Sequence, residues 1–283
     1  MPKQATERDP NHPETWKFTS PEQPGLHLVI SPENSACRKT WIYRLNLRKG
    51  SHHRLDANTL NVPGAPEGLE LNAMIASGSV RIDPAPTEAT EAEAQPRTLE
   101  RLDSWYQTPA DGVTVEALKD AMLYVGGAPY TGKGSFYLRP YDSSLPLGEI
   151  RQVHGKPPYR RDVFMTVDQE TEASTMINGI TWGDDGGWTS WPPHEHTEHL
   201  EEVYCYFDIP APRYALHFAS RKPAMVEAIH RVSTGDCVIV PEGYHPTAAC
   251  PGTRSCYFWV MAAHRPESRR YDLAVPDPAF PVE

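Results

Sequence analysis

The chain has 283 residues and a formal net charge of −10, with 23% charged residues and no basic stripe. An acidic surface repels phosphate backbones, so this composition argues against nucleic acid as a partner. There is no run of 18 apolar residues, and the first thirty residues are polar and rich in proline. We therefore expect neither a membrane span nor a signal peptide.

Short runs rich in Val, Ile, Tyr and Trp, separated by 29 prolines and 19 glycines, predict an all-β chain. The length allows one large domain or two of about 140 residues each. Five cysteines occur without Cys-x-x-Cys spacing, which favours a reducing, cytoplasmic location.

The first half, residues 1–150, is expected to form a barrel of its own. Strands are predicted at 27–30, 40–47, 70–82 (with a turn at the glycine), 123–125 and 135–139. The stretch 116–122 is expected to form one or two helical turns, and the acidic stretch 83–103 a long hairpin loop. His52 and His53 are adjacent and would point to opposite faces of a strand, so we expect no metal in this barrel.

The second half, residues 151–283, is expected to form a second barrel. Its predicted strands include 175–182, 213–218, 224–232 and 255–262. In the last of these, alternation places Tyr257, Trp259 and Met261 on one face.

A candidate metal site stands out in this second half. His194 and His196 are two residues apart, so in a strand both imidazoles leave the same face. A carboxylate follows at Glu201 or Glu202, and His245 comes two residues after the glycine of a Pro-x-Gly turn. Three imidazoles and one carboxylate can bind a single divalent ion and leave coordination positions open for substrate.

These motifs resemble a known family. The segments that carry the resemblance are Ser190-Trp-Pro-Pro-His194-x-His196, 200–206, 240–246 and 260–262. Together they are similar to the 5-deoxy-glucuronate isomerases of inositol catabolism, which share a superfamily with the 5-keto-4-deoxyuronate isomerases. The family pattern has lysine where this chain has Glu195, and asparagine where it has Trp259.

The resemblance implies a bicupin, an all-β fold of two stacked antiparallel barrels (jelly-roll type), with metal only in the second. It implies an aldose–ketose isomerase that converts 5-deoxy-glucuronate to 5-dehydro-2-deoxy-gluconate. It favours zinc, with manganese or iron next. Spacing in cupins selects Glu201 as the ligand, whereas the longer strand match to the related isomerases selects Glu202. Only one of these neighbours can point inward, and we favour Glu202.

The remaining site residues follow from the chemistry of the reaction. A base must move a proton between C2 and C1 of the sugar acid, and the candidates are Glu195, Glu201 and Tyr244. Arg160 or Arg161 could bind the substrate carboxylate through a guanidinium fork, although a solvated pair with Asp162 would explain them equally well. Tyr257 is predicted to contact substrate.

Two other functions stay open at this point. An iron-dependent cupin dioxygenase would use the same ligands, and a non-catalytic bicupin would bind a sugar acid or metal without turnover. In each case the expected partner is a small molecule rather than a membrane or nucleic acid. A homo-oligomer is also left open.

Overall fold

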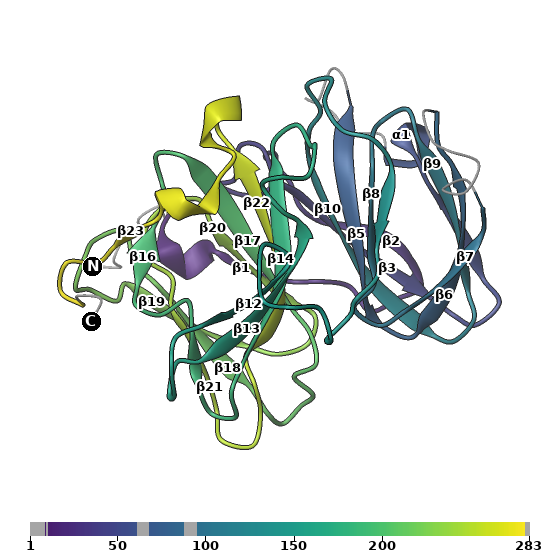
Figure 1. Ribbon diagram of the computed structural model, residues 1–283. Coiled ribbons are helices and arrows are strands. Elements are labelled where there is room, and N and C mark those ends of the chain that lie inside the picture. Colours follow the sequence, from purple (N-terminus) through teal and green to yellow (C-terminus); the bar gives the residue numbers. More distant parts are fainter. Residues whose placement is uncertain (1–8, 10, 61–67, 88–94, 281–283) are drawn as a thin grey trace, which may run out of the picture.

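The computed structural model describes residues 9, 11–60, 68–87 and 95–280. Two large antiparallel sheets pack face to face at the centre of the molecule, and a smaller four-stranded sheet lies on the outer side of each (Figure 1). The prediction of an all-β chain is confirmed.

The first large sheet has six strands, all from the first half of the chain. Their order is β11 (Tyr137–Arg139), β8 (Ser104–Gln107), β5 (Leu69–Ser77), β10 (Ala121–Pro129), β3 (Trp41–Leu47) and β2 (Gly25–Ile30). The small sheet that closes this barrel has the order β4 (His52–Leu55), β9 (Gly112–Ala117), β6 (Ser79–Ala85) and β7 (Arg97–Glu100).

The second large sheet has seven strands. Their order is β1 (Lys17–Thr19), β20 (Asp236–Val240), β17 (Leu200–Tyr206), β22 (Cys256–Ala263), β14 (Met176–Gly183), β13 (Arg161–Val167) and β12 (Arg151–His154). Its small partner sheet has the order β15 (Trp188–Thr189), β21 (Thr247–Ala249), β18 (Ala215–Ala219) and β19 (Ala228–Val232), and β16 (His194–Glu195) pairs with β23 (Val275–Pro276). Helical turns are short: η1 (Pro13–Thr15), α1 (Ala57–Leu60), η2 (Pro266–Ser268) and η3 (Tyr271–Leu273).

Strand β3 shows why the central strands are apolar throughout. All seven of its residues are buried, because one face lines the first barrel and the other faces the second. Trp41 and Tyr43 belong to the core of the first barrel, whereas Ile42 joins the larger core that spans the interface between the sheets. Alternation along one strand therefore serves two separate cores.

The interface between the large sheets is close-packed and contains a few polar contacts. A Cβ atom added at Gly126 would lie 2.7 Å from a methyl carbon of Val260, so the absence of a side chain there allows the sheets to approach. Asn72 of the first sheet accepts hydrogen bonds from Thr166 at 2.7 Å and Asn178 at 3.2 Å in the second.

Two buried glutamates connect the barrels reciprocally. Glu70, the second residue of β5, accepts hydrogen bonds from the backbone N–H groups of residues 174–176 at 2.6 to 2.9 Å, where β14 begins. Glu201, the second residue of β17, accepts from the backbone N–H groups of Arg38 at 2.8 Å and Lys39 at 2.7 Å, just before β3. Each carboxylate thus accepts hydrogen bonds from backbone N–H groups at the start of a strand in the other barrel.

Two local predictions are wrong. The stretch 116–122 forms no helical turn, because β9 ends at residue 117 and β10 begins at residue 121. The carboxylate of Asp120 holds the connecting turn by accepting from Arg48 and from the Lys49 N–H, so tertiary contacts override the helix-forming composition. The acidic loop is shorter than 83–103, because its ends pair as β6 and β7; residues 88–94 lie outside the described part.

The boundary between residues 150 and 151 stays a prediction. Strand β1 precedes the first barrel in sequence but pairs with β20 in the second sheet, with Lys17 opposite Val238. No helix in the described ranges is long and apolar enough to cross a membrane. A cytoplasmic location and a homo-oligomer stay predictions.

Candidate metal centre

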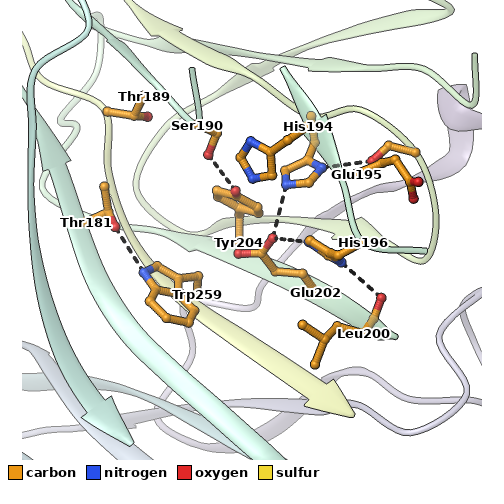
Figure 2. A network of polar contacts seen from close by, with 12 residues as sticks. Thr181, Thr189, Ser190, His194, Glu195, His196, Leu200, Glu202, Tyr204 and Trp259 are labelled. Carbon is orange, nitrogen blue, oxygen red and sulfur yellow. Dashed lines mark hydrogen bonds and ion pairs between the residues drawn. The ribbon is translucent and has the colours of Figure 1, made fainter. Parts of the chain in front are cut away.

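Three buried side chains of the second barrel converge on one point. His196 follows β16, Glu202 lies in β17, and His245 follows the turn after β20. The Nε2 atoms of His196 and His245 lie 3.1 and 3.2 Å from Oε2 of Glu202. The donor atoms of the three residues all lie within 4.8 Å of one another, which is close enough to share a metal ion. Figure 2 shows Glu202 and His196 turned toward each other, with His194 close by.

Backbone carbonyls hold each imidazole in one orientation. Nδ1 lies 3.0 Å from a carbonyl oxygen in every case: Pro192 for His194, Leu200 for His196 and Gly243 for His245. A carbonyl can only accept, so each Nδ1 carries a proton, and Nε2 is the nitrogen through which each neutral imidazole can bind a metal ion. Such contacts behind the ligand are typical of metal-binding histidines.

The charges of the cluster also suit a cation. Burial opposes ionisation of Glu202, but the hydrogen bond from His196 and the two histidines beside it lower its pKa to about 2. Burial lowers the pKa of His194 to about 3, with His245 adding to the effect. His245 Nε2 is buried without a hydrogen-bond partner. A buried carboxylate beside imidazoles, with one Nε2 that has no hydrogen-bond partner, fits a divalent metal ion.

His194 lies beside this cluster. Its ring centroid is 4.9 Å from that of His245 and 6.4 Å from that of His196. Its role as a further ligand stays a prediction. Of the two adjacent glutamates, Glu202 joins the cluster, as we favoured.

None of the three predicted bases lines the cavity next to the cluster, so their expected position is wrong. Glu201 faces the other barrel, because strand alternation turns it away from Glu202. Glu195 accepts a hydrogen bond from the Thr197 N–H at 2.7 Å, and Tyr244 lines a separate, mainly apolar pocket together with Trp191.

The cavity itself combines polar and apolar walls. Its lining residues are Gln152, His154, Arg161, Val163, Met165, Thr181, Ser190, His194, Glu202, Tyr204, Tyr257, Trp259 and Met261. The predicted common face of Tyr257, Trp259 and Met261 is confirmed. The indole N–H of Trp259 donates to Thr181 at 3.0 Å, which fixes the ring across the cavity wall (Figure 2).

Only one of the two predicted arginines reaches this cavity. Arg161 lines the cavity and donates a hydrogen bond to the carbonyl of Trp191 at 3.0 Å. Burial lowers the pKa of its guanidinium, and no acidic side chain in the described ranges forms an ion pair with it. Arg160 instead pairs with Asp162 at 2.9 Å and Asp184 at 3.2 Å. Neighbouring strand residues face opposite ways, so the pair divides into a cavity residue and a surface residue.

The sequence pattern missed several cavity groups. Tyr204 lies two residues after Glu202 in β17, so alternation could have placed it on the same face. Ser190 could not be found this way. Its φ of 51° lies in the left-handed region, which residues with side chains seldom adopt outside special sites.

Two stacked β-barrels, the second holding a buried cluster of two imidazoles and a carboxylate, define a bicupin with a candidate metal centre. The chain belongs to the KduI/IolB family, whose model matches residues 16–279.

Curated relatives resemble part of the chain. The 5-deoxy-glucuronate isomerase of Geobacillus thermodenitrificans is 30% identical over 167 residues, which are 56% of this chain and 59% of that protein. The enzyme of the same name from Lacticaseibacillus casei is 23% identical over 208 residues, covering 69% of this chain and 74% of its own length. The match to the Geobacillus protein therefore spans less than two thirds of it.

Solved structures support the fold over nearly the whole chain. An IolB-like protein from Salmonella typhimurium superposes with a TM-score of 0.77 at 21% identity, covering 94% of this chain and 97% of the other. Oxalate decarboxylase from Lactobacillus farciminis gives a TM-score of 0.56 at 11% identity, with 89% and 86% covered. At these identities the likeness concerns the fold, and the predicted bicupin is confirmed.

Proposed function

We propose that this protein is a metal-dependent aldose–ketose isomerase of a sugar acid. We further propose 5-deoxy-glucuronate as the substrate and 5-dehydro-2-deoxy-gluconate as the product, a step of inositol catabolism. The observation that carries the proposal is the buried cluster of His196, Glu202 and His245 with its preset tautomers. Family membership and the names of the curated relatives supply the substrate.

The ligands of the metal would be His196, Glu202 and His245, with His194 as the fourth. Zinc is proposed, and manganese or iron would suit the same mixed nitrogen and oxygen donors. When bound, such an ion supplies Lewis-acid polarisation of the substrate carbonyl.

The other cavity residues bind and orient the substrate. Among the described residues Arg161 has no acidic partner, and its guanidinium can bind a carboxylate in two hydrogen bonds. Tyr257 and its neighbouring hydroxyls face the sugar oxygens. Trp259 and Met261 cover the carbon chain and exclude water from that side.

The test combines metal analysis with turnover. We expect close to one equivalent of zinc per chain, and conversion of 5-deoxy-glucuronate to the ketose with deuterium entering at C1 or C2 in heavy water. His245→Ala should abolish both metal binding and conversion, whereas His27→Ala, a histidine outside the cavity, should preserve them. Oxygen consumption with an iron-loaded protein would instead support the dioxygenase. Substrate binding without conversion by metal-loaded protein would overturn the isomerase proposal.

A further inference from the structure

A chain of buried hydroxyl groups leads away from the cavity. Ser190 Oγ lies 2.7 Å from the hydroxyl of Tyr204 and 3.3 Å from that of Tyr257 (Figure 2 shows the first contact). The Tyr257 hydroxyl donates to Thr189 at 3.0 Å. The Thr189 hydroxyl lies 2.6 Å from the hydroxyl of Thr247, which in turn lies 2.8 Å from the hydroxyl of Ser255. All six residues are buried, and Ser190, Tyr204 and Tyr257 line the cavity beside Glu202.

Ser190 can switch this chain between two arrangements. The proton of Tyr257 is committed to Thr189, so Ser190 has two choices. If Ser190 donates to Tyr257, Tyr204 donates to Ser190 and presents an oxygen lone pair to the cavity. If Ser190 donates to Tyr204, the Tyr204 proton is free to point into the cavity. Rotation of one hydroxyl therefore changes Tyr204 from an acceptor to a donor.

An aldose–ketose isomerase needs such a change. The oxygen on C1 begins as a carbonyl, which only accepts, and ends as a hydroxyl, while the oxygen on C2 changes in the opposite sense. A guanidinium or amide N–H can donate to either oxygen but cannot accept the proton of the hydroxyl. A hydroxyl that can reverse its direction matches both.

We propose that Tyr204, Ser190 and Tyr257 form a proton relay between the two neighbouring oxygens of the substrate; this rests on the isomerase function proposed above. Tyr204 gives its proton to O1 and takes that of Ser190. Ser190 takes the proton of Tyr257, which turns from Thr189, and Tyr257 takes the proton that O2 loses.

The transfer balances without any other reactant. One O–H bond breaks at O2 and one forms at O1, and each protein hydroxyl gives one proton and takes one. The O2–H electron pair becomes the second bond of the C2 carbonyl, and the second bond of the C1 carbonyl becomes the O1–H bond. The C2–H pair ends as the new C1–H bond, and its proton moves separately from the relay.

Two further features of the structure agree with this role. Burial raises the pKa of Tyr257, which keeps its hydroxyl protonated between turnovers. The left-handed backbone of Ser190 places its Oγ between two tyrosines from different strands, and unusual backbone of this kind gathers at functional sites. Thr189 acts as a positioning residue that orients Tyr257.

The test compares single hydroxyl deletions in the metal-loaded enzyme. Ser190→Ala and Tyr257→Phe should each lower kcat by about 100-fold with KM changed less than about threefold, as expected for a lost proton-transfer group. Thr189→Val, which leaves the cavity surface intact, should lower kcat by about tenfold. The matched control is Tyr206→Phe, since its buried hydroxyl contacts His217 at 2.8 Å outside the relay.

A second readout separates a relay from a structural role. The wild-type enzyme should show a solvent deuterium isotope effect on kcat with a curved proton inventory, which reports several protons in flight, and Ser190→Ala should make the inventory linear. Thermal unfolding and metal content of the variants should match those of the wild type. If Ser190→Ala does not fold, the kcat of Tyr257→Phe tests the relay instead. Values of kcat for both variants within threefold of Tyr206→Phe would overturn the relay while leaving the isomerase standing. A wild-type enzyme that converts no sugar acid would overturn both.

Discussion

The two barrels share one plan and differ in what fills them. In both, the second residue of an equivalent strand is a buried glutamate that holds the strand entry of the other barrel, Glu70 in β5 and Glu201 in β17. The next residue points into its own barrel, and here they diverge: Leu71 in the first and Glu202 in the second.

Strand register makes this correspondence specific. Leu71 lies opposite Gly127 of β10, as Glu202 lies opposite Met261 of β22. Two residues further along each strand, the first barrel has Ala73 and the second has the cavity residue Tyr204. The first interior is filled mainly by apolar side chains, whereas the second keeps a polar cavity. The shared contacts specify the scaffold, and the inward-facing residues specify the chemistry.

The largest effect on activity is expected when Glu202 is replaced by leucine, the residue found at the equivalent position, Leu71, of the first barrel. Glu202→Leu removes the one carboxylate of the cluster, so we expect loss of bound metal and a fall in kcat/KM of at least about 1000-fold, or ~4 kcal/mol. Metal stoichiometry and the isomerase assay measure the two losses. Circular dichroism should show an intact fold, and a variant that keeps its metal would contradict the assigned site.

The reverse exchange should affect stability rather than activity. Leu71→Glu places a carboxylate among the apolar side chains of the first core, at a cost of about 3 to 5 kcal/mol in the free energy of unfolding. Denaturant unfolding measures this cost, with Leu71→Met as the volume-matched control. A loss below 1 kcal/mol would mean that the first interior admits water or a partner.

Removing either reciprocal glutamate contact should cost a similar, smaller amount. In Glu70→Gln and Glu201→Gln the amide NH₂ cannot accept, so buried N–H donors lose an acceptor and stability falls by about 2 kcal/mol. Thermal unfolding of both variants under the same conditions gives the comparison. Metal binding should persist in Glu201→Gln, because that side chain faces away from the site. Loss of metal from this variant would contradict the conclusion that Glu202, and not Glu201, faces the metal cluster.

The smallest effects should come from the paired arginines. Arg161→Gln removes a cavity cation and should raise KM for the sugar acid about tenfold, or ~1.4 kcal/mol, with little change in stability. Arg160→Gln removes a partly exposed ion pair and should change neither KM nor stability by more than about 1 kcal/mol. Equal changes in KM would show that the carboxylate does not bind on the cavity side.

Much of the candidate site could be predicted because it depends on short-range periodicity. Two-residue spacing in a strand places side chains on one face, and this rule predicted the common face of Tyr257, Trp259 and Met261. It also singled out His196, which joins the metal cluster, together with His194, whose role as a ligand stays a prediction. The same rule showed that only one of Glu201 and Glu202 can face inward. It could not choose between them, because the partners of Glu201 lie about 160 residues earlier in the chain.

The sequence by itself predicted the all-β class, several of the strands and turns, and the candidate ligands His196 and His245 with one of two adjacent glutamates, since all of these follow from local pattern. Tertiary structure alone decided what each remaining polar group contacts. It moved Glu195, Glu201 and Tyr244 out of the cavity, made the 116–122 stretch a turn that leads from β9 in the small sheet to β10 in the large sheet, and brought Ser190 between two tyrosines by an unusual backbone angle. Such outcomes depend on contacts between distant segments, and no spacing within one strand carries that information.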